Sequence, residues 1–343
     1  MPPRCARGAE VPIGRSSHSV NVVNSKVLIF SGEELPRVPI AANPANNFGG
    51  SGFEAFDLGQ SVWVKDASAA TKTGAPQPRV GHASAQIGNK IYILGGRGGA
   101  EMVPFDSDLF EFDADTGRWN IVSPASKCTV ESRSYHSMTA SKDYVFVFGG
   151  CPAKGRLNDL HQFDPATRTW TQFPSHSEIS PRGGPALAVL GDRLVVFGGF
   201  NGNELGDMWT IPVGKDAGPI AEREWKRIMV PVGSLVPDRR SVAGFVALTD
   251  KFVLFHGERD PSSKGHEGAG LYHRDVWTFK FTSKENDAVQ TGIWEEQEVE
   301  QNGQNPTARG WIAAAPLNGD KVVMVGGFDG EVRDNGVYLL SFD

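Results

Sequence analysis

Residues 133–150 read RSYHSMTASKDYVFVFGG, and this stretch decides the fold. It opens with an arginine, has a histidine three residues later, and continues as two apolar strands that end in a glycine pair. The interval from Arg133 to Gly149 is 16 residues. The same unit recurs along the chain, and self-similarity at a fixed spacing is the mark of a repeat architecture.

Six arginines open such units, and each precedes a glycine pair or a variant of one. They are Arg15, Arg79, Arg133, Arg182, Arg240 and Arg309, called the repeat arginines below. The pairs begin at Ser31, Gly95, Gly149, Gly198, His256 and Gly326. The interval is 16 residues in the first five units and 17 in the last, which indicates a tandem repeat.

Two more strands complete the predicted unit. A variable loop follows each pair, then a third strand such as residues 108–113. A tryptophan marks a fourth strand at Trp63, Trp119, Trp170, Trp225 and Trp294. Each unit is therefore predicted to be a four-stranded antiparallel sheet with the tryptophan in the core. Glycines suit the crowded inner strands, where a Cβ would clash or forbid the backbone angles.

The last unit shows only three strands, so the N-terminal segment, about residues 3–12, is expected to supply the fourth and close the ring. Without it, a sheet edge would stay exposed. We predict one all-β domain over residues 1–343, a six-bladed β-propeller. Its blades start near residues 15, 79, 133, 182, 240 and 309.

Composition narrows the partners and the compartment. The net charge is −6 with no basic block, which argues against nucleic acid or an anionic membrane as the main partner. No apolar run is long enough to span a membrane, and no secretory signal is recognised. Cys5, Cys128 and Cys151 cannot all pair, so free thiols in a cytoplasmic protein are expected. The oligomeric state stays open, with a homodimer as one option.

The residue after each glycine pair is expected at the mouth of the central channel. These residues are Glu33, Arg97, Cys151, Phe200, Glu258 and Phe328. Glu33 is a candidate substrate contact on this ground, although a polar mouth can also be merely hydrated. Two long loops, residues 35–52 and 258–274, should overhang the same mouth and form a lid over a pocket.

The loop of the fifth unit carries the sharpest chemical signal. Residues 256–270 read HGERDPSSKGHEGAG, with carboxylates and a histidine close together in a glycine-rich loop. Carboxylate and imidazole ligands suit a divalent first-row metal such as Fe(II). A polar loop whose charges face water is the alternative. His18, His82 and His136 recur in register, which favours structural roles for them.

The glycine pair with a downstream aromatic and tryptophan is the signature of the kelch repeat. Beyond this, the chain resembles the kelch-type specifier proteins of glucosinolate breakdown, the nitrile-, epithio- and thiocyanate-forming group. The resemblance covers all six units. It is carried by residues 131–138, 156–160, 181–185, 199–202 and 309–311.

This resemblance implies a ferrous site formed by a Glu-x-x-x-Asp-x-x-x-His motif. The motif places Glu258 and His266 as iron ligands and catalytic residues. Ser262 stands where the family has aspartate, and Asp260 would supply the missing carboxylate if the loop bends differently.

The resemblance also implies substrate contacts. It places Arg97 and Arg156 near an anionic sulfate, which a guanidinium matches in a bidentate way. It places Trp311 in the pocket wall. Ion pairs between blades are the alternative role for the two arginines.

The implied activity is an Fe(II)-dependent, lyase-like conversion of a glucosinolate aglucone to a nitrile at the channel mouth. A myrosinase-type hydrolase would supply this small anionic substrate. Two alternatives stay open, since one fold hosts many functions. One is a diverged kelch enzyme acting on another small molecule, which Ser262 favours. The other is a kelch module that binds a protein partner without catalysis.

Overall fold

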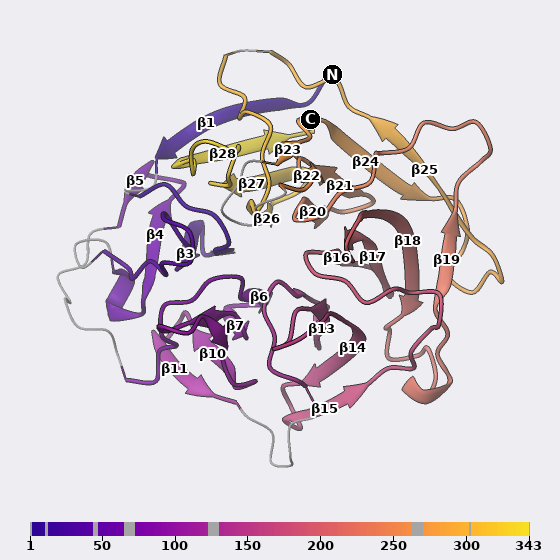
Figure 1. Cartoon of the computed structure of the whole chain (residues 1–343), viewed down its shortest axis with the longest axis horizontal. Helices are drawn as coiled ribbons and strands as arrows, with labels where there is room; N and C mark the ends of the chain where they lie inside the picture. The colour runs from indigo at the N-terminus through magenta and orange to yellow at the C-terminus, as the bar shows by residue number, and fades with distance from the viewer. Residues whose placement is uncertain are drawn as a thin grey trace.

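Antiparallel sheets arranged around a central axis make up the computed structural model (Figure 1). It describes residues 2–10, 13–43, 47–64, 73–122, 130–262, 270–301 and 303–342. No helix in these ranges is long and apolar enough to cross a membrane. The helices are short 3₁₀ turns, η1 (Phe48–Gly50) and η2 (Ile220–Glu222).

Each unit contributes its strands in the order predicted. The first sheet is β2 (Ser19–Val23), β3 (Lys26–Phe30), β4 (Phe53–Asp57) and β5 (Val62–Trp63). The second is β6 (Ala83–Ile87), β7 (Lys90–Leu94), β10 (Leu109–Asp113) and β11 (Arg118–Ile121). The third is β12 (Ser137–Ala140), β13 (Val145–Gly150), β14 (Leu157–Asp164) and β15 (Thr169–Gln172).

The fourth and fifth units share one sheet, because their outer strands pair in parallel. The fourth has β16 (Ala186–Leu190), β17 (Arg193–Phe200), β18 (Glu204–Pro212) and β19 (Lys226–Met229). The fifth has β20 (Gly244–Ala247), β21 (Phe252–Phe255), β24 (Val276–Phe281) and β25 (Gln290–Glu296). The join is β19 to β25, where Ile228 lies opposite Gln290.

The last sheet combines both ends of the chain. It contains β26 (Ala313–Leu317), β27 (Lys321–Val325), β28 (Gly336–Ser341) and β1 (Arg4–Glu10). β1 runs antiparallel to β28, with Arg4 opposite Ser341. The inner strands β2, β6, β12, β16, β20 and β26 contact one another in turn, and β26 contacts β2.

A ring of backbone hydrogen bonds circles the axis at the mouth. Its members stand two residues after the repeat arginines: Ser17, Gly81, Tyr135, Gly184, Val242 and Trp311. Each N–H donates to the carbonyl of the preceding member, and Ser17 N–H donates to Trp311 O, with N···O distances of 2.6–3.2 Å. All have φ between 48° and 65°, a region that non-glycine residues rarely occupy.

The repeat arginines are structural, and their contacts explain the 16-residue interval. Each donates through Nη1 to the carbonyl of the first residue of its own pair, as Arg133 does to Gly149 at 2.9 Å. Carboxylates of the third strand or of the loop before it also bind to repeat arginines, namely Glu54, Asp159, Asp207, Asp275 and Asp334. Their burial makes these ion pairs part of the frame.

The second residue of each pair is always glycine because of its backbone and its neighbours. Its φ lies between 85° and 102° in every unit. A Cβ on Gly150 would lie 2.6 Å from His136 Cβ, and its N–H donates to Arg182 O of the next unit at 2.8 Å. The first residue has φ of 50–64°, which Ser31 and His256 also adopt.

The tryptophans of the fourth strands pack between neighbouring sheets, as predicted. Trp119 stacks on Phe53 of the preceding sheet at 5.5 Å between ring centroids. Trp225 likewise contacts Phe148 of the preceding sheet, here with the rings edge-on. These rings fill the core and leave the chemistry to the loops at the mouth.

Candidate functional site

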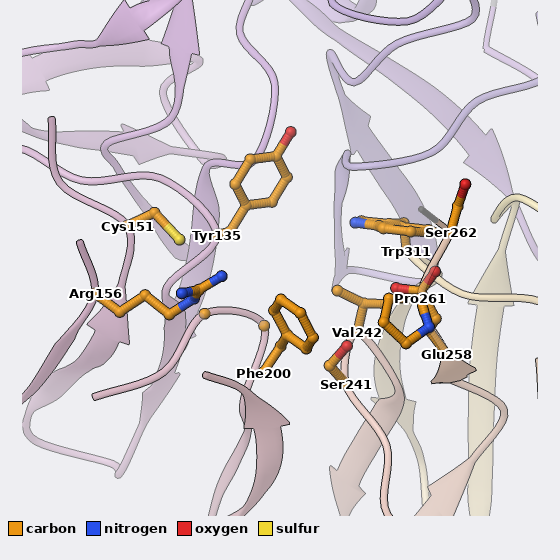
Figure 2. Close-up of a pocket in the computed structure, with 12 residues that line it drawn as sticks. Tyr135, Cys151, Arg156, Phe200, Ser241, Val242, Glu258, Pro261, Ser262 and Trp311 are labelled. Atoms are coloured by element: carbon orange, nitrogen blue, oxygen red, sulfur yellow. The ribbon is translucent and has the colours of Figure 1, made fainter. Parts of the chain in front are cut away.

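A cavity of about 260 Å³ opens at the mouth, between the third and sixth units (Figure 2). Its lining comes from loops after the second strands and from the backbone ring. The lining residues are Tyr135, Cys151, Arg156, Gly183, Gly184, Phe200, Ser241, Val242, Glu258, Pro261, Ser262 and Trp311. The cavity is therefore asymmetric, set over one half of the ring.

A recurring backbone bridge brings the loop residues to the mouth. The residue after each glycine pair pairs with the residue after the repeat arginine, as Glu258 does with Ser241. Cys151 and Phe200 are held in the same way by Ser134 and Gly183. Of the predicted mouth residues, Cys151, Phe200 and Glu258 thus line the cavity.

Arg156 is the cation of the cavity wall. Its guanidinium carbon lies 4.8 Å from the centroid of the Phe200 ring. Its buried Nε has no hydrogen-bond partner, and no ion pair joins it to a carboxylate, among the described residues. The more deeply buried repeat arginines, by contrast, all donate hydrogen bonds within the protein. Arg156 is therefore available to an anion in the cavity.

Glu258 is the carboxyl group of the opposite wall. It begins β22 (Glu258–Asp260), which pairs with β23 (Leu271–Tyr272), and it is 7% exposed. Burial raises the pKa of Glu258 to about 7, against a weaker opposing effect of the Ser262 backbone N–H. A carboxyl with this pKa exchanges its proton near neutral pH, which suits general acid–base chemistry.

A second buried carboxyl lies behind this wall and escaped the sequence analysis. Ser241 Oγ donates to Glu204 Oε1 at 3.2 Å, and Glu204 is 6% exposed. Burial raises the pKa of Glu204 to about 8, and the charges of Glu258 and Asp260 act in the same direction. The available signal was an acidic residue directly after the Asn-Gly-Asn turn, at the start of a buried strand.

The predicted substrate contacts have different places. Trp311 lines the cavity, and its ring centroid lies 6.1 Å from that of Tyr272. Arg97 begins β8 (Arg97–Gly98), which pairs with β9 (Val103–Pro104), and its Nε donates to Ser134 Oγ at 2.8 Å. Its guanidinium carbon lies 5.6 Å from the ring of Tyr135, so it contacts a wall residue without belonging to the wall.

Glu33 lies outside the cavity lining as well. It is buried and forms an ion pair with Arg333 at 3.2 Å. Its second oxygen accepts the backbone N–H of Arg37 at 2.6 Å. Both oxygens are thus engaged by the protein itself.

The predicted iron ligands come together only in part. Ser262 lines the cavity with Glu258, whereas the Asp260 side chain is 65% exposed and faces Arg259 at 3.4 Å. His266 lies outside the described residues. Within the described ranges, no three His, Cys, Asp or Glu side chains are grouped to hold a metal ion. Taken alone, these residues do not fit a ferrous ion, because they bring one buried carboxylate to the cavity.

Cys151 adds a thiol to the cavity wall. Burial raises the pKa of this thiol, against smaller opposing effects of Arg156 and Arg97. Cys5 is the other cysteine in the described ranges and forms no disulfide there, and Cys128 lies outside them. Burial raises the pKa of Cys5 to about 11, so this thiol stays protonated at neutral pH.

Comparisons with known proteins agree with this architecture. The N-(sulfonatooxy)prop-2-enimidothioate sulfolyase of Thlaspi arvense is 28% identical over 341 residues, covering 94% of this chain and 90% of the relative. Kelch domain-containing protein 3 of Homo sapiens is 27% identical over 297 residues, covering 79% and 69%. The solved structure of YjhT superposes with a TM-score of 0.67 at 17% identity over 97% and 95%, which supports the fold alone.

A family model supplies the identification. The KLHDC2/KLHL20/DRC7 kelch-repeats domain matches residues 17–257, which is most of the chain. This match agrees with the repeated arginine and glycine contacts and with the sheets around the axis. The chain therefore belongs to this kelch-repeat family, and it is distantly similar to a specifier-type sulfolyase.

Proposed function

We propose that the cavity binds a small sulfated or otherwise anionic molecule and converts it in a lyase-type reaction. The observation that carries this proposal is Arg156, a guanidinium in the cavity wall without an ion-pair partner among the described residues. The substrate named for the Thlaspi arvense sulfolyase carries a sulfonatooxy group, which is an anion of this kind. The proposal takes the fold as a six-bladed propeller closed by β1 against β28, which the ring of backbone hydrogen bonds supports.

Arg156 would bind the anion, because its planar fork donates two N–H groups to neighbouring oxygens. Phe200 packs against the guanidinium and keeps it directed into the cavity. Val242 and Trp311 supply apolar wall, which excludes water and strengthens the attraction between the charges.

Glu258 would move the proton that the reaction needs. Its carboxyl oxygen lines the same cavity, and burial brings its pKa to about 7. At neutral pH it can therefore give a proton to a leaving oxygen or take one from the substrate. Ser262, also in the wall, bonds to it through its backbone N–H.

Ferrous iron enters the proposal through the sequence resemblance, with Glu258 and His266 as its ligands. When bound, iron would supply Lewis-acid or one-electron chemistry. The described residues bring one buried carboxylate to the cavity, so no step here is assigned to the metal. Iron is treated as a separate variable in the test.

The test combines the anaerobic protein with a 2-propenyl glucosinolate and a myrosinase-type hydrolase, with and without Fe(II). Products are separated by gas chromatography. We expect nitrile or thiocyanate to form beside the isothiocyanate, and Arg156→Met to lower that yield by about 100-fold, the loss of one charge-assisted contact. Arg118→Met, on an exposed strand position, is the matched control. Equal yields from Arg156→Met and Arg118→Met would refute the assignment of Arg156.

Two other outcomes correspond to the open alternatives. If the aglucone is inert but other organosulfates lose sulfate, the chain is a diverged enzyme with the same pocket. A protein-binding module is favoured by exposed apolar side chains on the mouth loops. These are Leu35, Val38, Val103, Leu271 and Val332. In that case Leu35→Asp would abolish partner binding, and Arg156→Met would leave it unchanged.

A further inference from the structure

We infer that the ligand of this cavity carries a hydrogen-bond donor, best a protonated amine, at the end opposite its anionic group. The structure assigns Ser241 and Glu258 as the site for this donor and Glu204 as the residue that positions Ser241. The inference deepens the proposed function and rests on it, because it takes Arg156 as the site of the anion.

The polar groups of the cavity stand on two sides (Figure 2). Arg156 comes from the third unit and can only donate hydrogen bonds. Ser241 and Glu258 come from the fifth unit and face it across Phe200 and Val242. A molecule with an anion at one end and a donor at the other matches this division.

Ser241 is held so that its oxygen can accept. Its hydroxyl hydrogen goes to Glu204 Oε1 at 3.2 Å, and both its backbone groups bond to Glu258, at 2.9 and 3.1 Å. The oxygen lone pairs are then the part of Ser241 that remains for the cavity. Among the described residues, no other group donates to them.

The equivalent serines of two other units each accept a hydrogen bond from an arginine, and Ser241 has no such donor among the described residues. Ser16 Oγ accepts from Arg333 Nε at 3.0 Å, and Ser134 Oγ accepts from Arg97 Nε at 2.8 Å. In each case an arginine of the protein supplies the donor. In the fifth unit the same position faces the cavity, so a ligand would supply it.

Glu33 of the first unit and Glu258 of the fifth unit differ in the same way as the serines. Arg333 bonds to Ser16 and also forms an ion pair with Glu33, so one cation bridges both side chains. Ser241 and Glu258 repeat this serine and glutamate at the same positions of the fifth unit. Within the described ranges, no arginine or lysine pairs with Glu258. A cationic amine fits there as Arg333 does in the first unit.

Glu204 keeps Ser241 in this orientation. It begins β18 directly after a turn and reaches Ser241 of the next unit. The charged groups around it are Glu258 and Asp260 of β22, Arg156 stacked on its strand partner Phe200, and Arg239 packed on Gly206. None of them bonds to its carboxyl in the described part of the chain, so Ser241 is its polar partner.

Two matched probes test the inference by calorimetry in EDTA buffer, where no metal bridges probe and protein. They are 4-methylbenzenesulfonate and 4-(aminomethyl)benzenesulfonate. We expect the wild type to bind the amine at least about 10-fold more tightly, the effect of one charge-assisted hydrogen bond. Glu258→Gln and Ser241→Ala should each reduce this ratio to about 3 or less.

Glu204 is tested by rescue. Glu204→Gln keeps an accepting oxygen and should retain the ratio, whereas Glu204→Leu should lose it, and melting curves check that both variants fold. Arg156→Met should weaken both probes by a similar factor. Equal wild-type affinities for the two probes would overturn the inference while leaving the proposed anion site in place. If neither probe binds the wild type, the anion site itself fails, and the inference falls with it.

Discussion

Glu33 and Glu258 hold the same position in two repeats and have opposite fates. Both follow a variant of the glycine pair, Ser31-Gly32 or His256-Gly257, and both bridge to a serine after a repeat arginine. Glu33 is closed off by Arg333 and a backbone N–H, whereas Glu258 faces the cavity and has a raised pKa. The repeat places the carboxylate at the mouth in both units. Among the described residues, a neighbouring cation is found beside Glu33 and not beside Glu258, and we take this difference to decide whether the carboxylate is part of the frame or a site.

The largest expected effect comes from breaking the frame that both positions share. Arg240→Met removes the arginine that bonds to His256 O at 2.9 Å and to Asp275 through both oxygens, at 2.6 and 2.7 Å. The free energy of unfolding should fall by about 3–5 kcal/mol, because the partly buried Asp275 carboxylate and the buried His256 carbonyl both lose their partner. Urea denaturation measures it. A loss below about 1 kcal/mol would contradict a structural role for the repeat arginines.

The next effect is specific to the first unit. Arg333→Met leaves Glu33 buried without its cation and should lower the free energy of unfolding by about 3 kcal/mol. Adding Glu33→Gln removes the stranded charge and should recover part of the loss. Denaturation of the single and double variants checks this. The pair is not coupled if Glu33→Gln lowers the free energy of unfolding by the same amount in the Arg333→Met variant as in the wild type.

Above neutral pH, Glu258→Gln should not lower the free energy of unfolding, in contrast to the two arginine variants. The pKa of Glu258 is raised by folding to about 7, so the native state binds the proton more tightly than the unfolded chain. Its contribution is present below about pH 4.5 and is lost as the pH rises through about 7. The variant should therefore be as stable as the wild type or more stable at pH 8, with a flatter pH profile. A steep loss of stability at pH 8 would instead mark Glu258 as structural.

The sequence predicted the fold because its signals are local. The constant interval from arginine to glycine reflects one hydrogen bond within each unit, such as the one from Arg133 to the Gly149 carbonyl. Because every unit needs this bond, the spacing recurs along the sequence. The site was predicted less completely. Arg97 and Arg156 both stand in mouth loops, and only the structure shows that Ser134 engages Arg97. Glu204 was missed because its contact crosses from one unit to the next, which no spacing within a unit reveals.

The smallest expected effect concerns the backbone ring beneath both positions. Val242 and Ser17 hold equivalent places, with φ of 48° and 56°. Glycine relieves that backbone by about 1 kcal/mol, so Ser17→Gly should stabilise slightly. Val242→Gly gains the same amount but loses apolar contacts of similar value, and the net change in the free energy of unfolding should stay within about 1 kcal/mol.

Val242→Gly should instead weaken ligand binding, because Val242 lines the cavity and Ser17 does not. Thermal melts and sulfonate titrations of both variants separate these effects. A loss above about 2 kcal/mol for Val242→Gly would show that its side chain holds the units together, and the difference between the first and fifth units would then be one of packing as well as charge.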